Sequence, residues 1–341
     1  MGARFKVLRA GPFVSVQDIG RTGYKRYGVT GSGAMDRFSY RMANIAVNQS
    51  LSNPALEVSL GGLELLCEHG TVAAAIAGGN FNIQLDDKSV QSCSTVIIKE
   101  GSVLRIRPGP WGSWCYVAFA GSIDSDSWLG SQSVHLNSGL CGKPIEVGDT
   151  IQLSDTATEL PIVGNFQSAD ELKPDTTIRA VLGPQDHYFT ADSIDALFSE
   201  AFLVTADYNR MGVRLSGPKL KISSPLDMPS EPIARGSLQV PGHGDPLLLL
   251  ADHQSTGGYP KVATVISCDQ DNFAQLRSGD KIRFESLQVA EALEAVRFAH
   301  QSRESLFGSF ARNAISLEER LAGCNLISGV TDASANTEPF A

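Results

Sequence analysis

The chain has 341 residues, of which 42% are hydrophobic and 19% are charged, so it can bury a sizeable core and is not expected to be disordered. With 28 Lys and Arg against 37 Asp and Glu, its net charge of −9 argues against non-specific binding to nucleic acid and against anionic membrane surfaces. No apolar run approaches the roughly 18 residues of a membrane span.

Short strands separated by turns rich in Gly, Pro, Asn and Asp are predicted for most of the chain. In chain order they are expected at 5–8, 81–85, 95–99, 103–107, 116–120, 178–182, 202–205, 212–215, 237–240, 247–250 and 263–267. Apolar residues at helical spacing predict helices at 38–47, 193–198 and 287–306, the last ending near Gly308. The fold class is therefore mainly β with a few helices.

The sequence repeats one local pattern. Gly148-Asp149-Thr150-Ile151-Gln152-Leu153 resembles Gly279-Asp280-Lys281-Ile282-Arg283-Phe284, and each looks like a tight turn that leads into a final strand. We therefore expect two similarly built β subdomains, at 1–165 and 166–286. Residues 287–341 form a tail that is expected to be helical at first and then disordered, because its last part is small and polar.

The location in the cell is predicted from the N-terminal segment and the cysteines. The first twenty residues hold no continuous apolar stretch, and none of the six cysteines forms a Cys-x-x-Cys pair. We expect free thiols and a cytoplasmic protein.

The densest set of polar groups lies at 251–261, between two apolar strands, where loops commonly carry sites. Lys261 offers a cation for a phosphate or carboxylate, and Asp252 offers a base. Hydrogen-bonding groups and flexible, closely approachable backbone come from Tyr259, Gln254, Thr256, Gly257 and Gly258. The simpler interpretation is a polar hairpin with a solvated lysine.

Two further segments are candidates for substrate binding. Gly31-Ser32-Gly33 precedes a predicted helix and could cradle an anion, although Asp36 is explained more simply as the cap of that helix. Upstream stand Gln17, Asp18 and Arg21, which an ordinary turn would also explain. Arg210 could clamp a carboxylate or could be solvated in a turn. No phosphate-binding P-loop, nucleophile elbow or metal-ligand pair of histidines is found, so no metal site is expected.

Several of these segments, in this order, resemble one known family. The matching segments are Val16-Gln17-Asp18-Ile19-Gly20-Arg21, Ser32-Gly33-Ala34-Met35-Asp36, Ala118-Phe119-Ala120-Gly121-Ser122, Asn209-Arg210-Met211-Gly212, Gly236-Ser237-Leu238-Gln239-Val240-Pro241 and most of 251–265. The resemblance is to the biotin-dependent carboxyltransferase family of subdomains A and B, also called allophanate hydrolase subunit 2, which includes the C subunit of 5-oxoprolinase and KipA. It implies two cyclophilin-like β-barrel subdomains.

The resemblance also implies a function that needs other proteins. The first hypothesis is a C-like subunit of an ATP-dependent 5-oxoprolinase, which opens 5-oxo-L-proline to L-glutamate. Its partners would be a B-like subunit, built of subdomains C and D, and a LamB/YcsF-type lactamase subunit; ATP would be bound by the complex. The alternatives are a carboxyltransferase half-site for a urea-like substrate, which would need biotin, and a KipA-like regulatory protein.

The chain departs from the family pattern at the 251–261 segment. Family members often show Asp-Arg-Gln-Thr where this chain has Asp252-His253-Gln254-Ser255. Histidine in place of arginine removes a permanent positive charge, so the choice of substrate could differ here.

Overall fold

Alternation of apolar and polar side chains builds the strands of the first half. In strand β1 (Ala3–Ala10), Phe5 and Val7 are buried while Arg4 is exposed. This period of two places one face of each strand on the core. The structure, a computed structural model, describes residues 2–160, 162, 164–223 and 228–313, with side chains up to residue 310.

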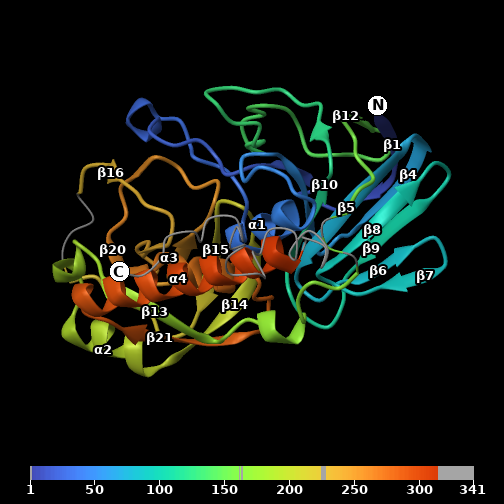
Figure 1. Cartoon of the computed structure of the whole chain (residues 1–341). Helices are drawn as coiled ribbons and strands as arrows, with labels where there is room; N and C mark the ends of the chain where they lie inside the picture. The colour runs from blue at the N-terminus through green and yellow to red at the C-terminus, as the bar shows by residue number, and fades with distance from the viewer. Residues whose placement is uncertain (1, 161, 163, 224–227, 314–341) are drawn as a thin grey trace, which may run out of the picture.

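Two sheets make up the first half (Figure 1). The seven-stranded sheet has the order β11 (Ser122–Ile123), β12 (Thr150–Ser154), β1, β4 (Leu63–His69), β9 (Val103–Arg107), β6 (Asn82–Leu85) and β7 (Lys88–Val90). The five-stranded sheet has the order β2 (Ser15–Gln17), β3 (Ala55–Ser59), β10 (Trp114–Phe119), β5 (Thr71–Gly78) and β8 (Ser94–Lys99). Phe5 and Phe119 meet in the core between them, with ring centroids 5.3 Å apart.

The second half closes into a barrel. Its strands follow the order β13 (Thr177–Leu182), β20 (Lys261–Val265), β17 (Ser237–Gln239), β18 (Leu247–Leu249), β15 (Gly212–Ser216), β14 (Ala201–Tyr208) and β21 (Lys281–Ser286). The parallel pairing of β13 with β21 completes the circle. Outside the barrel, β16 (Glu231–Pro232) pairs with β19 (Thr256–Gly257).

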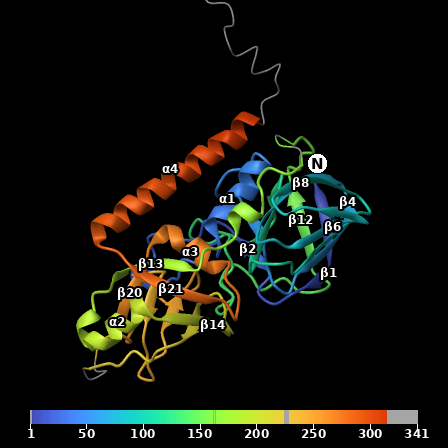
Figure 2. The ribbon, with the colours of Figure 1, turned by 90° about the horizontal axis from the view of Figure 1, so that it is seen from below.

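Four α-helices occur in the described ranges: α1 (Arg37–Ala46), α2 (Ala191–Ser199), α3 (Ser267–Ala274) and α4 (Val289–Asn313). Three short 3-10 helices lie at Lys25–Tyr27, Asp170–Leu172 and Asp186–Tyr188. Figure 2 shows α4 running along the outside of the molecule and past α1. The contacts between these helices include Phe38 against Phe307, with ring centroids 5.6 Å apart, and an Arg41–Glu304 ion pair. No helix in the described ranges is long and apolar enough to cross a membrane.

The structure confirms the mainly β fold, a closed barrel in the second half and the C-terminal helix, whereas the strands of the first half form two sheets. The predicted end of that helix near Gly308 is wrong, because α4 continues to Asn313 and buries both Phe307 and Phe310. Helix α3 was not predicted. The part of the tail that was expected to be disordered lies outside the described residues, and the subdomain boundaries remain predictions.

Candidate functional site

A buried ionic cluster joins the two halves. Arg210, in the turn between β14 and β15, is only 2% exposed and bonds to Asp252 through two nitrogens, Nε and Nη2, each at 2.9 Å. Its Nη1 bonds to Glu57 of β3, and its Nη2 also donates to the Gly33 carbonyl at 2.7 Å. Every guanidinium nitrogen of Arg210 therefore has a protein partner, and both carboxylate oxygens of Asp252 are engaged.

The electrostatics of this cluster favour the charged form of Arg210. Burial alone would lower the pKa of Arg210, but the carboxylates of Asp252 and Glu57 outweigh it and hold that pKa above its ordinary value. Glu57 also accepts hydrogen bonds from the Met35 amide at 2.7 Å and from the Tyr116 hydroxyl at 2.8 Å. The cluster thus fixes the 33–36 segment of the first half against the barrel of the second.

Asp36 caps helix α1. Its carboxylate accepts from the Ser39 amide at 3.0 Å and from the Gln275 side chain at 2.6 Å. Burial, and then the nearby Asp271, raise the pKa of Asp36 to about 6. The capping interpretation made from the sequence is therefore what the structure shows for this residue.

Gln17 and Asp18 are buried and hold a neighbouring loop. Asp18 accepts hydrogen bonds from the Gly20 amide at 2.7 Å, the Ser131 hydroxyl at 2.7 Å and the Gln132 amide at 2.6 Å. Gln17 donates to the Val134 carbonyl at 2.9 Å. Both side chains contact protein groups, in positions that shape the loop around Arg21.

A cleft lined by positive charge lies between the 19–37 loop and the second half. Figure 1 shows this loop as the blue segment that projects at the upper left. The cleft has a volume of about 380 Å³. Its lining residues are Ile19, Arg21, Thr22, Gly23, Lys25, Arg26, Gly31, Ser32, Arg37, Arg235, Ala251 and His253. Five of these are arginine or lysine and none is acidic, so the cleft suits an anion.

One wall of the cleft is a lysine–histidine contact. Lys25 Nζ lies 3.0 Å from His253 Nε2, and His253 Nδ1 lies 2.6 Å from the Gln254 carbonyl oxygen. Because that carbonyl can only accept, Nδ1 carries the proton and Nε2 accepts from the lysine. Burial, and then the charge of Lys25, lower the pKa of His253 to about 4, so the imidazole is neutral at pH 7. Burial also lowers the pKa of Lys25, helped by Arg37 and Arg235.

Residues 254–261 form a second group next to β16. Lys261 is 4% exposed; its Nζ lies 3.3 Å from Glu231, and its amide donates to Gln185 at 3.0 Å. Gly257 lies close to the Ile233 and Gln239 side chains, where an added Cβ would require these side chains to shift. Tyr259 is 47% exposed at the edge of this group.

The structure therefore sorts the predicted site residues into four places. Gln17 and Asp18 hold the loop at 131–134. Arg21 and Ser32 line the cationic cleft. Arg210, Asp252, Gly33 and Asp36 belong to the buried contact between the halves. The remaining residues lie in β19 or next to it: Lys261, Gln254, Thr256, Gly257, Gly258 and Tyr259. Sequence reasoning missed Lys25, Arg235, Glu57 and Glu231, whose only signal was their proximity to Gly-rich turns or apolar strands.

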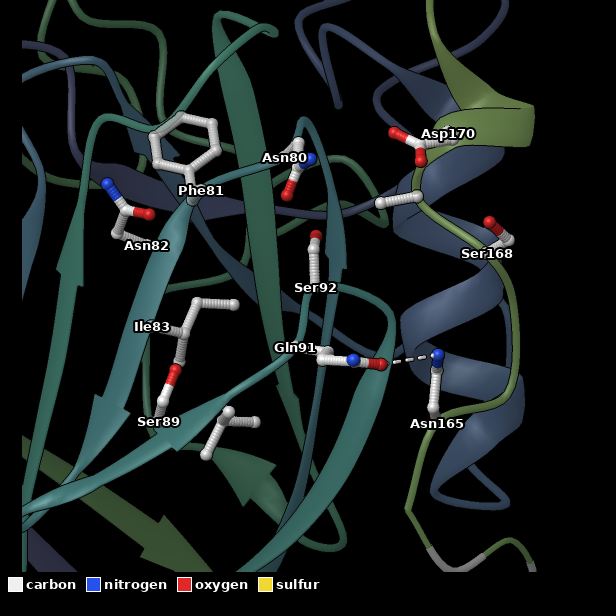
Figure 3. Close-up of a pocket in the computed structure, with 12 residues that line it drawn as sticks. Asn80, Phe81, Asn82, Ile83, Ser89, Gln91, Ser92, Asn165, Ser168 and Asp170 are labelled. Carbon is white, nitrogen blue, oxygen red and sulfur yellow. Dashed lines mark hydrogen bonds between the residues drawn. The ribbon is translucent and has the colours of Figure 1, made fainter.

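Another cavity lies away from these residues, in the first half (Figure 3). Neutral polar side chains such as Asn82, Ser92 and Asn165 line it, and the Asn165 amide donates to Gln91 at 2.9 Å. No group of His, Cys, Asp and Glu in the described residues could hold a metal ion.

The fold and the site define a carboxyltransferase-type module. A family model described as the carboxyltransferase domain, subdomain A and B, matches residues 27–286, and the chain belongs to this family.

Similar proteins make the comparison more specific. The chain is 34% identical to the C subunit of 5-oxoprolinase from Escherichia coli (strain K12), over 85% of this chain and 93% of that protein. It is 32% identical to the C subunit of 5-oxoprolinase from Haemophilus influenzae, over 83% and 91%. The crystal structure of the K. lactis urea amidolyase superposes with a TM-score of 0.79 at 29% identity, over 89% of this chain. The chain spans only 20% of the urea amidolyase chain.

Proposed function

We propose that this chain is the C-like subunit of an ATP-dependent 5-oxoprolinase complex that opens 5-oxo-L-proline to L-glutamate. The observation that carries the proposal is its correspondence, over more than nine-tenths of their length, with two proteins named as the C subunit of 5-oxoprolinase. Its partners in this proposal are a B-like subunit, built of subdomains C and D, and a LamB/YcsF-type lactamase subunit.

The chemistry explains why ATP is needed. A lactam resists attack by water because its amide is resonance-stabilised. Transfer of the γ-phosphoryl group to the lactam oxygen breaks the bond between the γ-phosphorus and the β,γ-bridging oxygen and releases ADP. Water then adds to the activated carbon, the C–N bond breaks, and the nitrogen takes a proton. This leaves an acyl phosphate of glutamate. A second water attacks its carbonyl carbon, the C–O bond breaks, and phosphate leaves with the former lactam oxygen, so that glutamate remains.

The geometry suggests different roles for the predicted residues. Lys261 is buried beside a single carboxylate, Glu231, so its charge is available to an anionic reaction centre that displaces this partner. Tyr259 is exposed and can contact a partner protein or substrate. We assign Asp252 and Arg210 a positioning role, because they bind each other and lie buried between the halves.

The carboxyltransferase half-site remains a second candidate because of the similarity to urea amidolyase. In that case the chain would act on a urea-like substrate with biotin supplied by a partner. The two candidates differ in cofactor, since only the second needs a biotinylated protein. A KipA-like regulatory role would need neither turnover nor biotin.

Reconstitution tests the proposal. The chain, its B-like partner and the lactamase subunit are mixed with ATP and 5-oxoproline, and glutamate and ADP are measured together. We expect equal amounts of both products, lost when this chain is omitted and unaffected by avidin, which captures biotin. Glutamate formation without this chain would contradict the proposal, and inhibition by avidin would favour the carboxyltransferase.

A further inference from the structure

Three buried hydrogen-bond donors in the lining of the cationic cleft have no partner among the described residues. They are Arg21 Nη1, Ser32 Oγ and Arg235 Nε. Their residues are 4%, 5% and 8% exposed. Buried polar atoms are nearly always hydrogen-bonded, so three unpaired donors in one cleft indicate an acceptor that binds there.

Other bonds hold the two arginines in place. Arg21 Nη2 donates to the Ser133 carbonyl at 2.6 Å, and its Nε donates to the Trp128 carbonyl at 3.2 Å. Arg235 Nη1 donates to the Ala34 carbonyl at 3.0 Å. All of these partners are neutral carbonyls, so they orient the guanidinium groups without neutralising them. The unpaired donors are thus preorganised for a ligand.

The positive charges of the cleft also lack a directly paired carboxylate. Within the described ranges, Arg21, Lys25, Arg26, Arg37 and Arg235 form no ion pair with a carboxylate. Lys25 contacts a neutral imidazole instead of an acid. Such a concentration of positive charge in a chain of net charge −9 calls for a ligand with several negative charges.

We propose that this cleft binds the phosphate chain of a nucleoside triphosphate. A carboxylate carries one charge and presents two oxygens in one plane, whereas the donors here come from three separate segments around 21–26, 32–37 and 235. A triphosphate offers several charges and many oxygens, and arginine and lysine both suit it. This inference rests on the proposed function, in which the complex consumes ATP, and it assigns the phosphate site to this chain.

Calorimetric titration of the full chain at pH 7 with tripolyphosphate, ATP and AMP tests the assignment. Tripolyphosphate and ATP are expected to bind, and AMP to bind at least tenfold more weakly. The test variants are Lys25→Gln, which removes one positive charge from the cleft, and Ser32→Ala, which removes one unpaired donor. Each is expected to weaken tripolyphosphate binding, the first by tenfold or more. The control is Lys88→Gln on β7, which removes the same charge from an exposed residue outside the cleft and should change nothing.

The outcomes separate this inference from the proposed function. Absence of tripolyphosphate and ATP binding overturns the inference, as does an equal loss in Lys25→Gln and Lys88→Gln, which would reflect net charge alone. If ATP does not bind and 5-oxoproline competes with tripolyphosphate, the cleft is a carboxylate site and the inference is also overturned. If the reconstituted complex turns over while its KM for ATP is unchanged by Lys25→Gln, the function stands and this inference fails. If the chain binds tripolyphosphate but the complex forms no glutamate, this inference stands and the proposed function fails.

Discussion

Arg210 shows how one residue can hold two β domains together. Its guanidinium bonds to a carboxylate from each half, Glu57 and Asp252, and to the backbone at Gly33. Burying these charges is favourable only because each group is paired and hydrogen-bonded. The arrangement also fixes the start of the segment that leads into α1, next to the cationic cleft.

Replacing Arg210 should destabilise the protein strongly. Arg210→Gln leaves the carboxylates of Glu57 and Asp252 buried without a cation, and such a change costs about 3–5 kcal/mol of the free energy of unfolding. The matched control is Arg214→Gln, which removes the half-exposed pair with Asp207 and should cost less than about 1 kcal/mol. Urea unfolding measures both. Similar losses in the two variants would contradict the role assigned to Arg210.

His253 should make the protein less stable in acid. Its pKa is about 4 in the folded state, below the ordinary histidine value of 6.5 that the unfolded chain retains, so the unfolded chain takes up the proton first as the pH falls. The contribution of neutral His253 is complete above about pH 6.5 and is lost as the pH falls toward 4, by up to about 3 kcal/mol. His253→Gln should flatten this fall, which unfolding curves between pH 4 and 7 would measure.

Asp36 acts in the opposite direction over part of the same range. Its pKa is about 6 when folded, above 3.8, so its contribution to stability falls as the pH rises from 3.8 through 6. Because Asp36 is present in both proteins, its effect cancels when the free energy of unfolding of His253→Gln is subtracted from that of the parent at each pH. A pH profile identical in the two proteins would show that His253 is not buried as neutral imidazole.

At the scale of elements, α4 packs against the helices next to the candidate site. Phe307 is 5% exposed against Phe38 of α1, whereas Phe298 on the same helix is 72% exposed. Arg303 of α4 also bonds to Asp271 of α3 at 2.7 Å. The helix therefore supports α1 and α3, the two helices that flank the 33–37 segment and the barrel.

Two phenylalanines on α4 provide a matched test of this packing. Phe307→Ala should lower the free energy of unfolding by about 3 kcal/mol, because it empties a buried site. Phe298→Ala removes the same atoms from an exposed position and should change stability by less than about 0.5 kcal/mol. Thermal unfolding of both variants measures the contrast. Equal effects would mean that α4 does not pack on α1 as described.

Most elements could be predicted from the sequence because their side-chain periodicity reflects burial on one face. The strand expected at 116–120 is β10, and the helix expected at 38–47 is α1. Helix α3 escaped prediction because its buried residues are largely polar: Asp269 and Asp271 are buried and pair with Arg179 and Arg303. A buried ion pair between distant elements leaves no local pattern.

At the scale of the whole molecule, the candidate site depends on contacts between distant segments. Ser32 could be predicted because it stands in a Gly-rich turn before a helix, and Arg21 because it belongs to the polar segment upstream of that turn. Lys25 and His253 are 228 residues apart, and Arg235 reaches the Ala34 carbonyl 201 residues away. The two halves must pack before these groups share a cleft, so no local motif could reveal it.

The fate of the lactam oxygen tests the proposed reaction most directly. The reconstituted complex is given ATP and 5-oxoproline labelled with ¹⁸O at the lactam carbonyl, and the phosphate formed is analysed by mass spectrometry. Because the proposed reaction moves that oxygen into phosphate, we predict labelled phosphate only when this chain is present. Unlabelled phosphate, with the label kept in glutamate, would contradict the proposed reaction, in which phosphate leaves with the lactam oxygen.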